Sequence, residues 1–219
     1  MESITTTRVL CLDGYLNATV FVRGTEVCAL GRARENGPLK LCRVFPQPGH
    51  LATVPQPPGH MLEDPRHLGF YSGRHYFICA DAIEYFESPG DYAIYQTVVA
   101  LTPANEMCDI WRVEAPGTRR VEKNWVPLGT LDENGCCALL YSHDTRQRLT
   151  LNCARRRAVL EEAPPPLTEP ARKQGVRGGT PLLPLPKGAG WWGLGHRAVP
   201  SSRRPIAHAS VCAVDAVIT

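Results

Sequence analysis

The stretch His67–Ala80, HLGFYSGRHYFICA, decides the fold class, because it places two apolar segments on either side of a serine and a glycine. Ser72-Gly73 is the kind of two-residue turn that joins neighbouring antiparallel strands. The flanking segments are rich in the aromatic and apolar residues that favour a pleated, half-buried surface. The stretch therefore predicts a β-hairpin.

The same order of apolar segment, glycine turn and apolar segment occurs at three more places along the chain. These stretches are Ala18–Ala33 around Arg23-Gly24, Trp125–Ser142 around Asn134-Gly135, and Thr180–Val199 around residues 188–190. A further strand candidate follows each hairpin: LKLCRVF, YAIYQTVVAL with CDIWRVE, RLTLNC, and HASVCAVDAVI. The pattern indicates an all-β protein made of short strands and tight turns.

A short polar motif precedes each hairpin, in the order YLNAT, LEDPR, EKNWVP and RGGTP. The motifs recur at steps of roughly 40–60 residues, which is the length of a propeller blade. We therefore expect residues 1–219 to form a single β-propeller domain with about four recognisable blades, of a five-bladed type whose last blade is missing or incomplete. The proline-rich ranges 45–60 and 155–175 are predicted to be loops between blades.

Composition narrows the possible classes of protein. Apolar residues make up 43% of the chain and charged residues 21%, which is typical of a globular protein. A net charge of +3 is too weak to indicate nucleic-acid binding, and no apolar run approaches the roughly 20 residues of a membrane helix. The N-terminus lacks the pattern of a signal peptide, so we expect a cytoplasmic protein. Nine cysteines without any CxxC pair indicate reduced core thiols and no metal site.

The ordered motifs resemble a known family. EDPR before one hairpin, EKNW.P before the next and the later GWWGLGHRAV are similar to landmarks of the five-bladed β-mannoside phosphorylases and the related β-1,2-mannosyltransferases. The resemblance implies an enzyme that transfers or phosphorolyses β-linked mannosyl residues of an oligosaccharide. It implies no cofactor, with inorganic phosphate as a co-substrate. Ala18 departs from the pattern, since these enzymes often carry proline there.

By this resemblance Asp64 is the catalytic acid, matching an aspartate that donates its proton through a sugar hydroxyl. Pro65 fixes the backbone after it, and Arg66 is suited to orient a carboxylate or bind an oxyanion. Glu63 and Arg66 are therefore candidate substrate-binding residues. The alternative is an ordinary turn shaped by Asp64 and Pro65, in which Arg66 pairs with Glu63.

The motif EKNW supplies a second set of candidates. Glu122 is suited to act as a catalytic base or to bind a sugar hydroxyl, Lys123 to neutralise phosphate, and Asn124 to contact the substrate. The alternative is a surface ion pair. For Trp125 we expect a place in the core, because an indole at the start of a strand usually contributes to packing.

A third set comes from the last hairpin and the first motif. Arg177 and Thr180 flank paired glycines, which allow close approach of the backbone to an anion, although a plain turn has the same composition. His196 and Arg197 match the strand that carries a phosphate-contacting histidine in the resembling family, and the alternative is a structural histidine. Asn17 is a candidate contact to the donor-side sugar or, alternatively, a turn residue.

Three hypotheses follow from these residues. The first is mannosyl transfer or phosphorolysis, with Asp64 as the acid and with Lys123, Arg177 and His196 holding phosphate. The second is a non-catalytic propeller that binds glycans or serves as a scaffold. The third is an inverting glycoside hydrolase in which Glu122 activates water. An incomplete propeller would also favour self-association.

Overall fold

The computed structural model describes residues 16–32, 37–84, 92–115, 125–142 and 147–162, together with five short strands between residues 176 and 212. Every helix or strand within this described part is a β-strand, and each pairing between strands is antiparallel. The expected all-β class is confirmed.

Three four-stranded sheets form the larger part of the fold, and in each the strand order follows the chain. The first sheet consists of β1 (Leu16–Arg23), β2 (Glu26–Arg32), β3 (Leu39–Phe45) and β4 (Gly49–Val54). The second consists of β5 (Leu62–Tyr71), β6 (Arg74–Glu84), β7 (Tyr92–Leu101) and β8 (Met107–Arg112). The third consists of β9 (Val126–Pro127), β10 (Cys136–Leu140), β11 (Arg148–Asn152) and β12 (Arg157–Leu160).

The predicted hairpin turns of these sheets are confirmed. Ser72 and Gly73 both have positive φ, at 47° and 78°, as a two-residue turn between right-twisted strands requires. Gly24 and Gly135, in the turns of the first and third sheets, also have positive φ, at 60° and 72°. Glycine adopts this conformation without steric cost, which explains why it punctuates each apolar segment.

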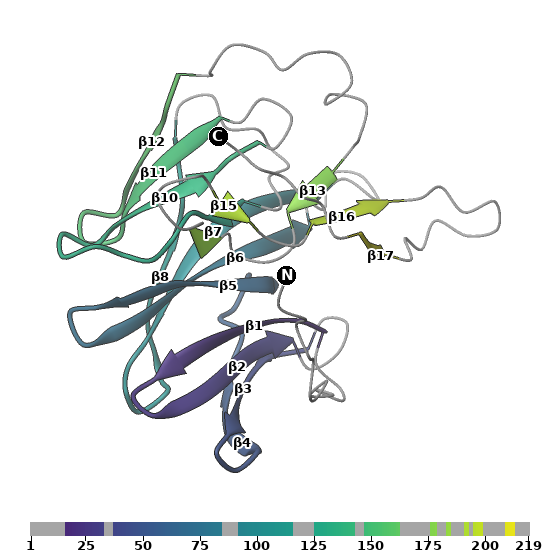
Figure 1. The fold of residues 1–219 in the computed structure, drawn as a ribbon, viewed down its shortest axis with the longest axis vertical. Helices are drawn as coiled ribbons and strands as arrows, with labels where there is room; N and C mark the ends of the chain where they lie inside the picture. Colours follow the sequence, from purple (N-terminus) through teal and green to yellow (C-terminus); the bar gives the residue numbers. More distant parts are fainter. Residues whose placement is uncertain are drawn as a thin grey trace, which may run out of the picture.

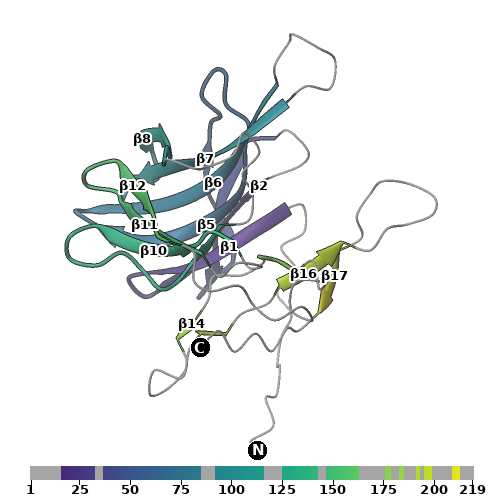
Figure 2. The same ribbon diagram turned by 90° about the horizontal axis from the view of Figure 1, so that it is seen from above.

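The sheets are stacked in the order of the chain, with their first strands adjacent. β1 contacts β5, and β5 contacts β9. Figure 1 shows the purple first sheet below, the second sheet in the middle and the green third sheet above, and Figure 2 shows the same stack from above. Successive four-stranded meanders whose first strands meet are the arrangement of a β-propeller, so the fold is propeller-like.

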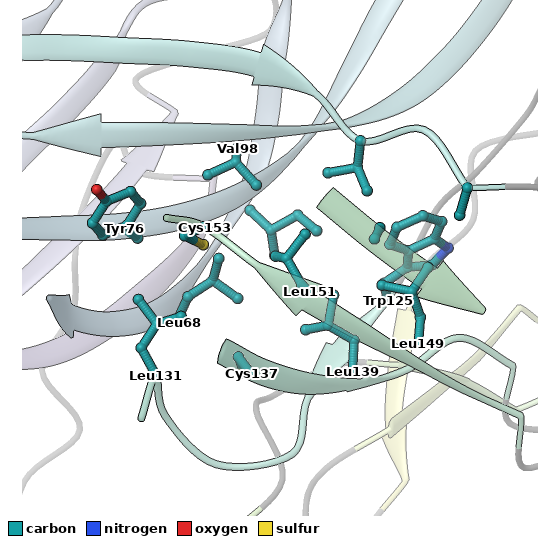
Figure 3. Packing of buried hydrophobic residues seen from close by; sticks show 14 of the residues in the cluster. Leu68, Tyr76, Val98, Trp125, Leu131, Cys137, Leu139, Leu149, Leu151 and Cys153 are labelled. Carbon is teal, nitrogen blue, oxygen red and sulfur yellow. The ribbon is translucent and has the colours of Figure 1, made fainter. Parts of the chain in front are cut away.

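Two apolar cores lie between the sheets. Between the first and second sheets, Phe21, Leu30 and Leu41 pack with Leu62 and Phe77. Between the second and third sheets, residues of β5, β6 and β7 face residues of β10 and β11 (Figure 3), namely Leu68, Tyr76, Val98, Cys137, Leu139, Leu149 and Leu151. Trp125 is 1% exposed within this second core, as expected for a packing residue.

The two predicted inter-blade loops each contain a strand, and that part of the prediction is wrong. Within residues 45–60, the segment GHLATV forms β4, since it is free of the prolines on either side of it and pairs as an edge strand. Within residues 155–175, β12 begins at Arg157 and alternates exposed and buried side chains, the pattern of a half-buried edge strand. Residues 163–175 lie outside the described part of the chain.

The fourth predicted blade differs from the first three. Its hairpin is present as β14 (Leu183–Pro184) paired with β15 (Trp191–Trp192), but this pair is a separate two-stranded sheet. A three-stranded sheet has the order β13, β16, β17, formed by Val176–Gly178, Gly195–Ala198 and Ala209–Cys212. A chain-ordered fourth sheet is therefore not formed by the described strands, and the number of blades stays a prediction.

The first sheet has one face against the second sheet and one more open face. Thr19 and Phe21 of β1 are buried, whereas Val20 and Val22, on the opposite face, are 57% and 65% exposed. Val27, Ala29, Cys42 and Val44 form a small apolar cluster of their own. Contiguous exposed apolar residues often mark a surface that packs against another element.

Thiols lie mainly in the interior. Among the described cysteines, Cys28, Cys42, Cys79, Cys137 and Cys153 are buried and free. Burial raises the pKa of Cys137 and of Cys153 to about 12, which keeps both thiols protonated at neutral pH. The described residues include no helix with the length and apolar character needed to span a bilayer.

Gly69 marks a close approach between β5 and the connection from β9 to β10. Its φ is +140°, and a Cβ on it would lie 2.8 Å from the backbone nitrogen of Leu131. The Leu131 N–H donates a 2.7 Å hydrogen bond to the Leu68 carbonyl oxygen at the same contact. Only a residue without a Cβ allows the two backbones to meet in this way.

We predict that Gly69→Ala lowers the free energy of unfolding by about 2 kcal/mol or more, because the added methyl collides with backbone and the φ is strained. Urea unfolding measures the change. Gly49→Ala is the matched control, since nothing lies within 4 Å of its Cβ position and its φ is ordinary. Equal stability of the two variants would contradict the close approach at Gly69.

Candidate active site at the start of β5

The motifs YLNAT and LEDPR form equivalent irregularities at the starts of β1 and β5. In β1, Leu16 is paired with Arg32 and Thr19 with Leu30, so the strand accommodates one extra residue between them. In β5, Glu63 is paired with Ala80 and Arg66 with Ile78, with the same shift. Asn17-Ala18 and Asp64-Pro65 thus occupy matching bulges. Bulges of this kind redirect side chains and are common near functional sites.

The bulge gives Asp64 an unusual backbone conformation. Its φ is 51°, in the left-handed region that residues with a Cβ seldom adopt. Such a conformation costs on the order of 1 kcal/mol or more and persists when the surrounding structure imposes it. Pro65, which follows, is buried and has no backbone N–H to leave unpaired. The motif is therefore a fixed structural feature of the strand.

Glu63 connects the start of β5 to the first sheet. Its carboxylate forms an ion pair with Arg32 of β2, with 3.0 Å between Oε2 of Glu63 and Nη1 of Arg32. The two side chains are only 15% and 11% exposed, so the pair is largely shielded from water. A shielded pair that loses one partner leaves a buried charge, which is strongly destabilising. The alternative of an ordinary turn, in which Arg66 pairs with Glu63, did not include this contact between sheets.

Arg66 is a buried cation next to the candidate acid. The residue is 9% exposed, and burial lowers the pKa of its guanidinium to about 10, while the negative charge of Asp64 opposes that fall. The guanidinium therefore remains charged at neutral pH. Burying a charge is less costly with a nearby counter-charge, so the negative charge of Asp64 favours the charged form of Arg66.

The connection before β5 is held by two polar side chains. Gln56 brackets Leu62, accepting from its N–H at 2.7 Å and donating to its carbonyl at 3.0 Å. Asp81 of β6, which is 1% exposed, accepts from the Met61 N–H at 2.9 Å and from Nδ1 of His60 at 2.6 Å. Both contacts lie directly ahead of Glu63 and Asp64.

The residue after the motif contributes to the contact between the first two sheets. The His67 N–H donates to Oγ1 of Thr19 at 3.3 Å, and the His67 ring stacks on Phe21 with centroids 4.7 Å apart. Nε2 of His67 lies 3.2 Å from Nδ1 of His75. Burial, together with the neighbouring His75, lowers the pKa of His67 to about 3. Both rings therefore lie uncharged in an aromatic contact at neutral pH.

Side chains are described for only some of the predicted site residues. Glu63, Asp64 and Arg66 lie together at the start of β5, as the motif required. Four others are placed by backbone alone: Asn17 at the β1 bulge, and Arg177, His196 and Arg197 on β13 and β16, where Arg177 is paired with His196 and Val176 with Arg197. Glu122, Lys123, Asn124 and Thr180 lie outside the described residues, so convergence of the full set stays a prediction.

Three contacts at this site were not expected from the sequence. Arg32 follows five uncharged residues at the end of β2, and a charge in that position is a recognisable signal of a partner. Asp81 follows a run of apolar residues in FICADAIE and likewise indicates a charge that needs a partner. Gln56, in a proline-rich connection, carries none. Within the described residues, no group of three or more histidine, cysteine, aspartate or glutamate side chains is arranged to hold a metal ion.

Comparison with known proteins places the chain by fold. No family model and no curated protein matches the sequence. Two structures from Bacteroides ovatus are similar, one of a candidate glycoside hydrolase (TM-score 0.56, 13% identity, 84% of this chain and 62% of that one) and one of a glycosyl hydrolase (0.56, 14%, 87% and 62%). A candidate glycosidase from Bacteroides thetaiotaomicron is also similar, with a TM-score of 0.57 and 13% identity over 86% of this chain and 63% of that one.

At these identities the similarity shows a shared fold. The chain spans about three fifths of the length of each of these three structures. These neighbours are described as glycoside hydrolases or glycosidases.

The depressed pKa of His67 predicts loss of stability in acid. In the unfolded chain an ordinary histidine binds a proton near pH 6.5, whereas folded His67 resists protonation until about pH 3. The unfolded state then binds more protons, so the free energy of unfolding falls as pH drops from 6.5 towards 5, by on the order of 1 kcal/mol per pH unit. In urea unfolding at both pH values, His67→Gln should show a smaller decrease than the wild type. An equal decrease in the free energy of unfolding of the two proteins would contradict the depressed pKa of His67.

Proposed function

We propose that the chain is a carbohydrate-active protein that acts on a glycosidic bond, with Asp64 donating a proton to the leaving oxygen. The main support is the conformation of Asp64, a carboxyl group held with φ 51° in the bulge at the start of β5. Strained residues that the surrounding structure over-determines cluster at active sites. The fold neighbours, described as glycoside hydrolases, are compatible with this class of chemistry.

The first strands of propeller blades run in the same direction and start at the same mouth of the ring. Asp64 and Asn17 occupy matching bulges at two such starts. We place Glu122, Lys123, Asn124, Arg177, Thr180, His196 and Arg197 around the same mouth by extension. This ring is of the five-bladed type, and the open face of β1 would receive the closing sheet.

For the reaction itself, we propose phosphorolysis or transfer of a β-linked mannosyl group. Protonation of the leaving oxygen by Asp64 breaks the glycosidic bond while inorganic phosphate attacks the sugar from the opposite face, giving mannose 1-phosphate. Lys123, Arg177 and His196 would hold the phosphate oxygens. An inverting hydrolase is the second candidate, favoured by the hydrolase-like fold neighbours, in which Glu122 would activate water.

Incubation of the protein with β-1,2-mannobiose, with and without phosphate, separates these reactions. Mannose 1-phosphate formed only with phosphate is the expected result. Free mannose released equally in both conditions would assign the hydrolase instead. Sugar binding by calorimetry without any product would overturn the catalytic proposal in favour of a glycan-binding protein.

We predict that Asp64→Asn lowers product formation at least about 100-fold, because the amide retains the shape of the side chain but has no proton to donate. The measurement is the initial rate of the reaction found above, and urea unfolding checks that the variant is folded. Glu106→Gln, which neutralises an exposed carboxylate in the β7–β8 connection, is the matched control and should retain full activity. Equal rates in the two variants would exclude Asp64 as the acid.

A further inference from the structure

Asp81 is a buried carboxylate that the proposed reaction does not use. It is 1% exposed, on β6, and its Cα is paired with that of Leu62 at the start of β5. Its Oδ2 lies 2.6 Å from Nδ1 of His60 and 3.3 Å from Oγ1 of Thr97, while Oδ1 accepts from the Met61 N–H at 2.9 Å. Burial of a carboxylate is costly unless such donors compensate it.

The partners of Asp81 show what the carboxylate does. A carboxylate only accepts hydrogen bonds, so the proton of the His60 ring is on Nδ1 and points at Oδ2. His60 itself lies in a turn, where its N–H donates to the Pro57 carbonyl oxygen at 3.1 Å and Gly59 has a φ of 79°. Asp81 thereby ties this turn to β6 through one side-chain bond and one backbone bond.

The hydrogen bonds of Asp81 to His60 and Met61 lie next to Asp64, the residue with the left-handed backbone conformation. Met61 and Leu62 directly precede Glu63 and Asp64, and the Ala82 N–H donates to the Met61 carbonyl at 3.1 Å, which continues the ladder between β5 and β6. Gln56 holds Leu62 from the other side. The backbone ahead of the bulge is thus fixed at two successive residues, so Asp64 has little freedom to relax from its left-handed conformation.

We propose that His60 is a positioning residue that, through its hydrogen bond to Asp81, fixes the backbone carrying Asp64 in the geometry needed for proton transfer. The His60 side chain is 31% exposed, so its removal leaves no closed cavity in the core. The catalytic part of this inference rests on the proposed function, whereas the structural part does not. Misplacing a reacting group by about 1 Å can lower a rate about 100-fold.

Hydrogen exchange and steady-state kinetics test the two parts separately, using the full chain. In His60→Ala, the amides of residues 61–64 and 66 should exchange about tenfold faster than in the wild type, because a hydrogen bond to a charged group is lost. His60→Asn places an amide N–H near the position of Nδ1 and should restore most of the protection. His50→Ala, which removes an exposed histidine bonded only to Thr53 among the contacts described, should leave these amides unchanged.

Steady-state kinetics of the His60 variants measure kcat and KM separately. With an active wild type, His60→Ala should lower kcat by about 10- to 100-fold with little change in KM, and His60→Asn should recover it. Exchange that is unchanged in His60→Ala, or raised equally in both His60 variants, would overturn the inference. So would an unchanged kcat. An inactive wild type would contradict the proposed function and the catalytic role of His60, while the exchange experiment would still decide whether His60 fixes the backbone.

Discussion

β5 is packed on both faces, and the arrangement of the molecule depends on the contacts that hold it there. On one side the Thr19 hydroxyl and the ring of Phe21 meet His67. On the other side the Leu131 N–H reaches the Leu68 carbonyl past Gly69, a position with no room for a Cβ. The first strand of the second sheet is therefore fixed by both of its neighbours, and with it the motif at its start.

This double attachment explains how an unfavourable backbone conformation at Asp64 is maintained. A left-handed aspartate would relax in an isolated hairpin, because one hairpin turn constrains only its own residues. Here Glu63 is tied to Arg32, and Met61 and Leu62 are tied to Asp81 and Gln56. The cost of the conformation is spread over contacts from two sheets, and the carboxylate gains a fixed position beside Arg66.

Strands and turns could be predicted from the sequence because their signals are local. Gly24, Ser72-Gly73 and Gly135 separate short apolar segments rich in strand-forming residues, and the packing of Trp125 followed from its place beside a strand. The register shift at Asp64-Pro65 could not be predicted, since it depends on pairing with β6. The Arg32–Glu63 pair joins residues from different sheets, and no local pattern specifies such a partner. β4 and β12 were missed because flanking prolines and arginines obscured short edge strands.

The central claim is that Asp64 protonates the leaving oxygen, and leaving-group dependence tests it most directly. A general acid matters for an alkyl β-mannoside, whose alkoxide leaves poorly, and matters little for a 2,4-dinitrophenyl β-mannoside, whose phenolate leaves unaided. The measurement is kcat/KM of wild type and Asp64→Asn on both compounds. The account predicts a loss of at least about 100-fold on the alkyl mannoside and less than about tenfold on the aryl one. An equal loss on both substrates would contradict it.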